Sequence, residues 1–152
     1  MVFANSDGKT FRTEKLARAK HQRKTPCMLN IDDKQIFVIG GQHNTTNVML
    51  SSVSQFNIAQ NCWIEKMPKL VIPRVASSAC RAGGTIFVVG GVEGYGKTLN
   101  SIETLNLADL VKGKAVWKLI EPPEANFPGR ASPIVASLNS EEIVILGGYV
   151  GP

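Results

Sequence analysis

One short pattern occurs three times in this chain and constrains its fold more than any other feature. Each copy is a run of four apolar residues followed directly by two glycines. The copies span residues 36–41, 86–91 and 143–148. A spacing of roughly 50 residues indicates stacked supersecondary units rather than one continuous core. The chain is therefore expected to be built from repeats.

Other residues recur in step with the glycine pairs. A basic residue, Lys24, Arg74 or Arg130, precedes each pair at a nearly constant distance. Trp63 and Trp117 follow the first two pairs at similar distances. We expect the basic residues to anchor the entry to each inner strand, and the tryptophans to pack between neighbouring units.

The segments between these marks predict short strands. Residues 53–57 and 101–106 alternate apolar with polar side chains, as half-buried strands do. Each tryptophan opens a further strand, and the small residues of 76–80 and 131–138 predict the strand that precedes each glycine pair. One period therefore holds four short antiparallel strands.

At this point the chain resembles the kelch repeat family. The resemblance rests on the following marks of one period: Pro73-Arg74, strand 86–89, Gly90-Gly91, loop 93–101, strand 102–106 and Trp117. It implies that each repeat is a four-stranded blade of a β-propeller, with the glycine pair closing the second strand. The chain departs from the family at Phe56 and Leu105, where tyrosine is usual, and at Gly129, where proline is usual.

The expected fold is thus an all-β, incomplete propeller of about three blades. Residues 1–16 are interpreted as the last two strands of a preceding blade, 24–70 and 74–121 as two full blades, and 130–148 as the first two strands of a further blade. A seven-residue insertion near 108–116 is expected to form a loop. Propellers usually need about 4 to 8 blades to close, so two chains could associate as a homodimer and complete a six-bladed ring.

The positive charge of the chain lies at its N-terminus. Residues 1–24 carry seven basic and two acidic side chains, whereas the remainder of the chain carries ten of each. A basic segment such as 18–24 raises the alternative of nucleic-acid binding. Aromatic residues are not interleaved with these cations, which makes nucleic acid the weaker alternative.

A phosphate-binding pattern also occurs, since residues 91–98 fit G-x-x-x-x-G-K-[ST]. That motif needs a helix whose N-terminus faces the phosphates. Residues 99–105 instead match the third strand of the repeat. We therefore interpret 91–98 as a glycine-rich hairpin loop and expect no nucleotide or other cofactor.

The remaining residues predict a non-enzymatic, cytoplasmic protein. Cys27, Cys62 and Cys80 fall at non-equivalent repeat positions and show neither a disulfide framework nor zinc spacing, which favours a reducing compartment. No apolar run approaches the length of about 18 residues that a membrane-spanning helix needs, so no membrane segment is expected. No catalytic or metal-ligand set is evident. A remnant of a propeller enzyme, oxidase-like or isomerase-like, stays open as an alternative because some relatives of the fold carry such sites; the lack of a copper-type Tyr, His and Cys set argues against the oxidase.

The function expected from the resemblance is protein–protein interaction. In a four-stranded blade, the loop after the second strand and the loop between blades emerge on the same face, through which kelch propellers commonly bind partners. That face would hold several cations and a tyrosine, which suits a partner protein or an acidic peptide. The candidate partner-binding residues are Arg18, Lys20, Arg23, Lys24, His43, Asn44, Arg74, Tyr95, Lys97 and Arg130. The candidate structural residues are Gly40, Gly41, Gly90, Gly91, Gly147, Gly148, Trp63 and Trp117.

Overall fold

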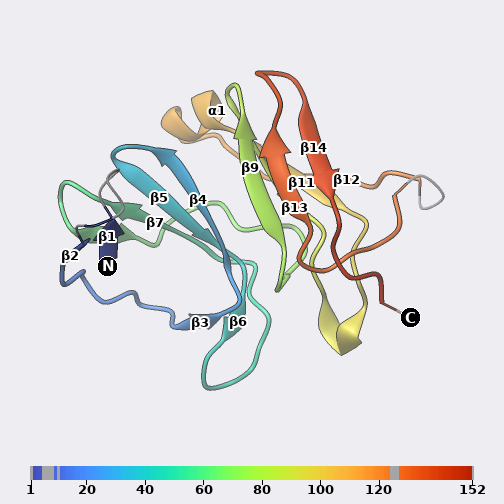
Figure 1. Cartoon of the computed structure of the whole chain (residues 1–152), viewed down its shortest axis with the longest axis horizontal. Helices are drawn as coiled ribbons and strands as arrows, with labels where there is room; N and C mark the ends of the chain where they lie inside the picture. Colours follow the sequence, from blue (N-terminus) through green and yellow to red (C-terminus); the bar gives the residue numbers. More distant parts are fainter. Residues whose placement is uncertain (1, 5–8, 10, 124–126, 152) are drawn as a thin grey trace.

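The computed structural model of the chain describes residues 2–4, 9, 11–123 and 127–151, and these are almost entirely β-structure (Figure 1). Two four-stranded antiparallel sheets form the body of the molecule, and shorter hairpins lie on either side of them. The prediction of an incomplete, all-β propeller of four-stranded blades is confirmed.

The first blade consists of four strands joined in sequence order. They are β4 (Cys27–Asp32), β5 (Gln35–Ile39), β7 (Val53–Asn57) and β8 (Cys62–Ile64). The strand predicted at 53–57 is found with those bounds, but its side chains are buried on both faces of the sheet, since the adjacent residues Val53 and Ser54 are both buried.

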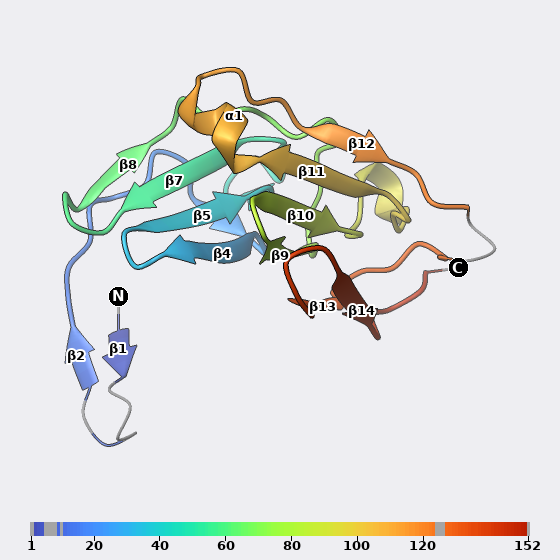
Figure 2. The same cartoon turned by 90° about the horizontal axis from the view of Figure 1, so that it is seen from above.

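The second blade repeats this arrangement with β9 (Ser78–Ala82), β10 (Thr85–Val89), β11 (Ile102–Asn106) and β12 (Lys118–Ile120). Its first strand, β9, lies beside β4, so the two blades sit side by side with their first strands adjacent (Figure 2). The register is also equivalent, since Ile39 pairs with Val53 in the first blade and Val89 with Ile102 in the second.

The remaining strands that the structure describes form three two-stranded sheets. They are β13 (Ile134–Ser137) with β14 (Ile143–Leu146), β1 (Val2–Ala4) with β2 (Phe11–Thr13), and β3 (Arg23–Lys24) with β6 (Gln42–His43). The β13–β14 hairpin continues the series of blades beyond β9, whereas the β1–β2 hairpin projects from the other end of the molecule (Figure 2).

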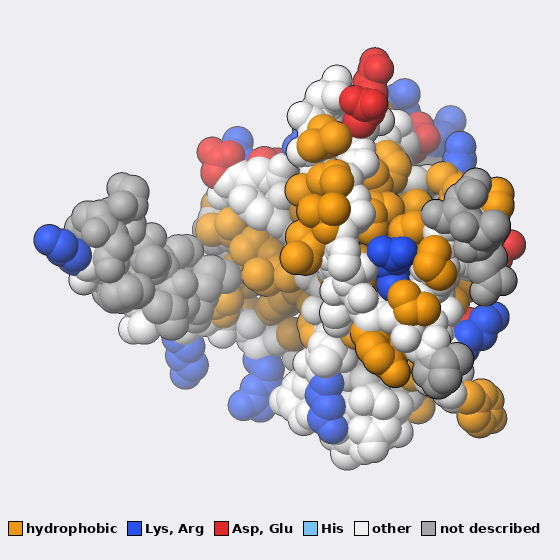
Figure 3. Space-filling view, turned by 45° about the vertical axis from the view of Figure 1, so that its right-hand side comes forward, with side chains coloured by type: hydrophobic (Ala, Val, Ile, Leu, Met, Phe, Trp, Pro, Cys, Tyr) orange, Lys and Arg blue, Asp and Glu red, His pale blue; other side chains and the backbone are white. Residues whose placement is uncertain are grey.

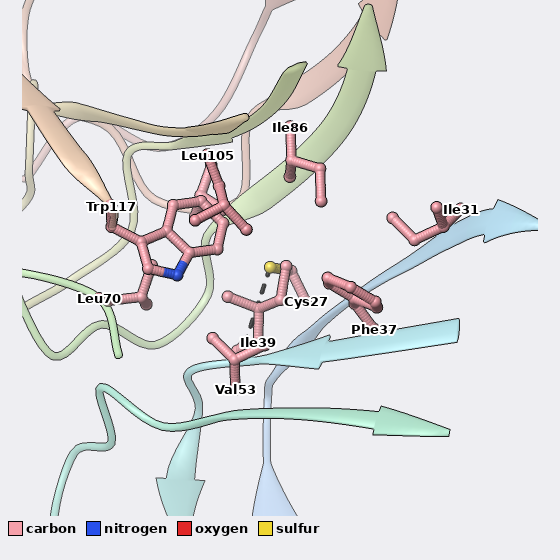
Figure 4. Close-up of a cluster of buried hydrophobic side chains, with 10 residues drawn as sticks. Cys27, Ile31, Phe37, Ile39, Val53, Leu70, Ile86, Leu105 and Trp117 are labelled. Atoms are coloured by element: carbon pink, nitrogen blue, oxygen red, sulfur yellow. Dashed lines mark hydrogen bonds between the residues drawn. The ribbon is translucent and has the colours of Figure 1, made fainter. Parts of the chain in front are cut away.

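Apolar side chains from both blades form the core between the sheets (Figure 4). Phe37, Ile39 and Val53 come from the first blade, and Ile86 and Leu105 from the second; each is at least 98% buried. Because the two sheets bury these side chains against each other, one blade alone would expose half of the core to water.

The chain turns sharply just before each first strand. Thr25, Ala76 and Ser132 all have a φ near +50°, and they occupy the same position in the three repeats. The N–H of Ala76 donates to the carbonyl of Thr25, at 3.2 Å, and the N–H of Ser132 to that of Ala76, at 2.7 Å. These turns explain why β9 begins at Ser78 and not at residue 76, where the sequence predicted it.

The insertion in the second blade contains a short helix where the sequence predicted a loop. This helix, α1 (Leu107–Val111), begins directly after β11. The side chain of Asn106 caps it by accepting a hydrogen bond from the N–H of Asp109, at 3.1 Å. Leu107 and Leu110 pack against the core, which stabilises a helix too short to form alone. Among the described residues, no helix has the length and apolar character needed to cross a membrane.

Candidate functional site

Two kinds of loop meet on one face of the blades. One kind follows the second strand of each blade, and the other links that blade to the next. At the first junction Gly41 N donates to Arg74 O, Arg74 N to Leu50 O and Leu50 N to Gly41 O, at 2.8, 3.4 and 2.8 Å. The same three bonds recur at the next junction among Gly91, Arg130 and Leu99. We call the surface formed by these two kinds of loop the loop face.

The glycine pairs allow the loops to approach this closely. All six glycines have φ between 60° and 100°, a region that favours glycine. A Cβ atom on Gly40 would lie 2.6 Å from Arg74 O, and one on Gly90 would lie 2.4 Å from Arg130 O. Both distances are far below van der Waals contact, so a side chain at either position would push the loops apart.

Arg74 is fully buried under the loop face. Its Nη1 donates to the carbonyls of Gly90 and Ser101, at 2.8 and 3.2 Å. Its Nη2 donates to Glu103 Oε1 at 2.7 Å and to the Ser101 hydroxyl at 3.2 Å. Burial lowers the pKa of Arg74, and the charge of Glu103 opposes this shift. The side chain is closed off from the surface, contrary to the expectation that it contributes to partner binding.

The counterpart of Arg74 in the first blade is Arg23, not Lys24 as the spacing predicted. Arg23 Nη1 donates to Gly40 O at 2.9 Å and Ser52 O at 2.7 Å, repeating the two carbonyl bonds of Arg74. Neighbouring residues of a strand point to opposite faces, so only one of the two basic residues can turn inward. Lys24 is exposed, and its Nζ donates to Asn47 Oδ1 at 3.4 Å.

A carboxylate supports the arginine of each blade, directly at the buried Arg74 and through Ser54 at the half-buried Arg23, and it comes from a different part of each blade. In the second blade Glu103 on β11 binds Arg74 and also accepts from the N–H groups of Val71 and Ile72, at 2.6 and 3.0 Å. These bonds fix the linker between the blades directly beneath the loop face.

In the first blade Ser54 occupies the position of Glu103. The Ser54 hydroxyl accepts from Arg23 Nη2 at 2.6 Å and donates to Glu65 Oε2 at 2.5 Å. Glu65, which follows β8, also accepts from the N–H of Lys20 at 3.3 Å. Burial lowers the pKa of Arg23, and the charge of Glu65 opposes that shift. Glu65 therefore supplies, from the position after β8, the carboxylate that Glu103 supplies from β11.

The tryptophans connect each blade to the linker that enters it. Trp117 Nε1 donates to Pro68 O at 3.1 Å, and Trp63 Nε1 donates to Ala17 O at 2.8 Å. Trp117 is 5% exposed, and the ring of Trp63 lies 5.0 Å from that of Phe56. Both indoles are thus engaged within the fold.

Tyr95 is the most prominent side chain of the loop face. It is fully exposed, and its φ of 61° places it at the apex of the short turn η1 (Gly94–Gly96). A hollow lies on each side of it. One, of about 510 Å³, is lined by Asn47, Met49, Pro73, Glu93, Gly94 and Tyr95. The other, of about 470 Å³, is lined by Tyr95, Gly96, Lys97, Thr98, Pro128, Gly129, Val150 and Gly151. We call them the Met49 hollow and the Thr98 hollow.

Lys97 lies at the rim of the Thr98 hollow and forms an ion pair with Glu93, with a distance of 3.1 Å between Nζ and Oε1. The chain after Thr98 runs directly into β11, so the helix that a phosphate-binding loop requires is not formed by this segment. The interpretation of residues 91–98 as a hairpin loop agrees with this geometry.

The structure brings together several of the other predicted residues. His43 pairs with Arg23 across the β3–β6 ladder, and the Asn44 N–H donates to Gln22 O at 3.0 Å. Lys24 contacts Asn47, which lines the Met49 hollow. A continuous surface therefore runs from Lys24 through the Met49 hollow to Tyr95. Two further predicted residues, Arg18 and Lys20, are exposed on the linker before the first blade. Arg130 is partly exposed and donates to Gly147 O at 2.9 Å.

Comparison with known proteins agrees with this geometry. Residues 73–109, which span Arg74 to α1, match the family model described as the Kelch motif. That segment is similar to a kelch motif. It is also 33% identical over 89 residues to Kelch-like protein 33 of Homo sapiens, a match that covers 59% of this chain and 16% of the relative. The matched region thus spans about a sixth of the length of that relative.

The repeat register also explains the two hollows; the sequence did not lead us to predict their lining residues other than Tyr95 and Lys97. Met49 and Thr98 each precede the leucine that bonds to a glycine pair, and Pro73 and Gly129 each precede an arginine of the Arg74 type. The two hollows are therefore equivalent sites of successive repeats. The signal was available in the sequence, because these residues keep a fixed distance from the leucine and the arginine.

Proposed function

We propose that this chain is part of a non-enzymatic kelch-type interaction module that holds an extended, acidic segment of a partner protein across its loop face. The observation that carries the proposal is the position of Tyr95, fully exposed between two equivalent hollows. Exposed tyrosines supply a large, rigid contact surface, and such residues often dominate the energy of an interface. A segment lying over Tyr95 would place a side chain into each hollow.

The charge of the surface supports an acidic partner. Lys24 borders the Met49 hollow and Lys97 the Thr98 hollow, while Arg18 and Lys20 are exposed on the adjoining linker. Glu93, which lines the Met49 hollow, is paired with Lys97. Complementary charge raises the rate of association and fixes the register of the bound segment.

The test is selection of peptides from a random twelve-residue display library with the purified chain, followed by affinity measurements on the enriched sequences. We expect acidic peptides whose affinity falls about tenfold or more with Tyr95→Ala, the range of an interface hot spot. Lys34→Ala is the matched control, because Lys34 is exposed at the β4–β5 turn. Enrichment without acidic residues, or equal binding by the Tyr95→Ala variant, would contradict the proposal.

A binding measurement with the same purified chain tests the nucleic-acid alternative. A fluorescein-labelled single-stranded DNA of about twenty nucleotides serves as the probe. Binding that weakens steeply with salt and is lost when Arg18 and Lys20 are replaced by alanine would favour nucleic acid. We expect the DNA to bind no better than a peptide of scrambled sequence. A cytoplasmic location also remains a prediction, to be checked by imaging the tagged chain in cells.

Completion of a six-bladed ring by two copies is a separate prediction. The β1–β2 hairpin of one copy would add to the β13–β14 hairpin of the other, giving a four-stranded sheet. Light scattering coupled to size exclusion tests it. A folded species of twice the chain mass supports the homodimer, whereas a folded monomer at every concentration contradicts it.

A further inference from the structure

The insertion of the second blade has no counterpart in the first blade. In both blades an asparagine ends the third strand and caps the turn after it: Asn57 Oδ1 accepts from the N–H of Gln60 at 2.9 Å, as Asn106 Oδ1 accepts from the N–H that it caps in α1. Residues 58–61 then lead directly to β8, whereas residues 107–117 contain α1 before the chain reaches β12. Closing a blade therefore does not require the insertion, and loops of this kind often carry function.

α1 leaves β11 at the end opposite the loop face, because successive antiparallel strands are joined at alternating ends. It extends toward β7 of the neighbouring blade (Figure 2). A hollow of about 430 Å³ opens there between the insertion and the linker that follows β8. It is lined by Gln55, Lys66, Met67, Pro68, Leu110, Gly113 and Ala115. We call it the Met67 hollow.

Contacts within the chain fix both walls of the Met67 hollow. On one side the carbonyl of Pro68 accepts from Trp117 Nε1 at 3.1 Å, and Met67 packs against the core. On the other side Leu110 packs against the core, and its carbonyl accepts from the N–H of Gly113 at 3.0 Å, which closes the turn after α1. The hollow is thus formed before any ligand binds, so few side chains need to be ordered on binding.

Gln55 gives the hollow a polar group of fixed orientation. Gln35 Nε2 donates to Asp32 Oδ2 at 3.4 Å, and Gln55 Nε2 donates to Gln35 Oε1 at 2.9 Å. The carboxylate of Asp32 therefore orients both amides. Within the described part of the chain nothing donates to Gln55 Oε1, so this oxygen can accept a main-chain N–H from a bound segment.

Three lysines accompany the hollow and give it positive charge. Lys66 lines it, and Lys112 and Lys114 lie on either side of Gly113 in the sequence. All three lysines are exposed, and no carboxylate among the residues that the structure describes forms an ion pair with them. Residues 107–117 contain a single acidic residue. The charge around the hollow therefore favours an acidic ligand.

We propose that the Met67 hollow binds a short acidic segment of a partner protein, with one large apolar side chain seated in the hollow. The apolar lining contacts that side chain, Gln55 Oε1 accepts a main-chain N–H, and the three lysines bind carboxylates on either side of it. A hollow with a directional acceptor suits a peptide better than a flat surface would. The site is separate from the loop face, so the inference does not depend on what the loop face binds.

The test is selection of peptides from a random nine-residue display library, with the Tyr95→Ala chain as bait so that the most exposed side chain of the loop face is absent. We expect enrichment of peptides in which acidic residues flank one large apolar residue. The affinity of fluorescein-labelled copies of these peptides for the same chain is then measured by anisotropy. Amide hydrogen exchange of residues 110–115 should slow when the peptide is bound.

Two variants of the bait test the assigned contacts. Lys112→Gln together with Lys114→Gln should weaken peptide binding about tenfold or more, because it removes charge-assisted contacts. Gln55→Met should weaken it about threefold to tenfold, the range of one hydrogen bond. Ile134→Thr is the matched control, because apolar side chains also gather over β13 and β14 (Figure 3), where Ile134 is more than half exposed. This control should leave the affinity unchanged.

Failure to enrich acidic peptides overturns the proposal, and so does undiminished binding by the lysine variant or the glutamine variant. Loss of binding in Ile134→Thr overturns it as well, since the peptide then lies on β13 and β14. Val111 is exposed beside Lys112, a combination that an anionic membrane also fits. Sedimentation with vesicles of phosphatidylserine and phosphatidylcholine tests that alternative. Sedimentation that depends on these lysines, by a chain that enriches no acidic peptide, would assign the surface to lipid and overturn the proposal.

Discussion

Arg74 Nη2 lies 2.7 Å from Glu103 Oε1, and both side chains are fully buried. This ion pair lies where the second strand, the third strand and the linker between the blades converge, because Arg74 also binds Gly90 O and Glu103 also binds the N–H of Val71. A buried charge without its partner is strongly unfavourable, so the pair makes these three segments depend on one another.

Arg74→Met should therefore destabilise the chain by about 3 to 5 kcal/mol, the cost of leaving a buried carboxylate unpaired. The measurement is chemical denaturation followed by circular dichroism. Arg130→Met is the matched control, because Arg130 holds the same repeat position but is partly exposed; we expect it to change the free energy of unfolding by less than about 1 kcal/mol. If both variants lost the same free energy of unfolding, burial of the ion pair would not be the source of its effect on stability.

The different source of the carboxylate in the first blade gives a second prediction. Glu65→Ala removes the acceptor of the Ser54 hydroxyl and of the Lys20 N–H, so we expect a loss of about 1 to 3 kcal/mol in the free energy of unfolding. Adding Ser54→Glu restores the arrangement of the second blade and should recover at least half of that loss. Ser54→Glu with Glu65 retained is the control, since two carboxylates near Arg23 repel each other. Failure of the double variant to recover would mean that the two blades do not use equivalent sites.

The sequence was sufficient for the parts of the fold that periodicity controls. The apolar runs before the glycine pairs and the alternation in 53–57 predicted strands that the structure contains. Periodicity could not identify which of two adjacent basic residues turns inward, because Arg23 and Lys24 are one position apart and only the register of β3 decides between them. The helix α1 escaped detection because it lies in an insertion, where packing of Leu107 and Leu110 on the core outweighs the repeat pattern.

Some residues of the candidate site could be predicted from the sequence and others could not. Tyr95 and Lys97 were predicted from their loop, and both line the Thr98 hollow. The carboxylate that replaces Glu103 in the first blade could not be predicted, because Glu65 lies after β8 and not in the third strand, and strand order alone does not show which side chains come into contact.

Thiol reactivity provides a third prediction, with a pH dependence. Burial raises the pKa of the Cys27 and Cys80 thiols above their ordinary value of 9.0, whereas the side chain of Cys62 is only half-buried. The thiolate is the reactive form, so a raised pKa lowers its fraction at pH 8 and moves its rise to more alkaline pH. Ellman's reagent should therefore react with Cys62 first in the native chain, and with all three thiols together after denaturation. Rapid modification of Cys27 in the folded chain would contradict its burial.

Glycine substitutions separate backbone strain from close packing, because two equivalent glycines differ only in their surroundings. Gly90 and Gly147 have φ values of 61° and 60°, but a Cβ atom would lie 2.4 Å from Arg130 O in the first case and more than 4 Å from any described atom in the second. Gly147→Ala should cost about 1 to 2 kcal/mol, the strain of a left-handed alanine. Gly90→Ala adds the collision and should cost about 3 kcal/mol or more. Denaturation of the two variants measures the difference. Similar losses in the free energy of unfolding would mean that the loop of Arg130 moves to accommodate a methyl group. The glycine pair would then be needed only for the backbone conformation of the turn.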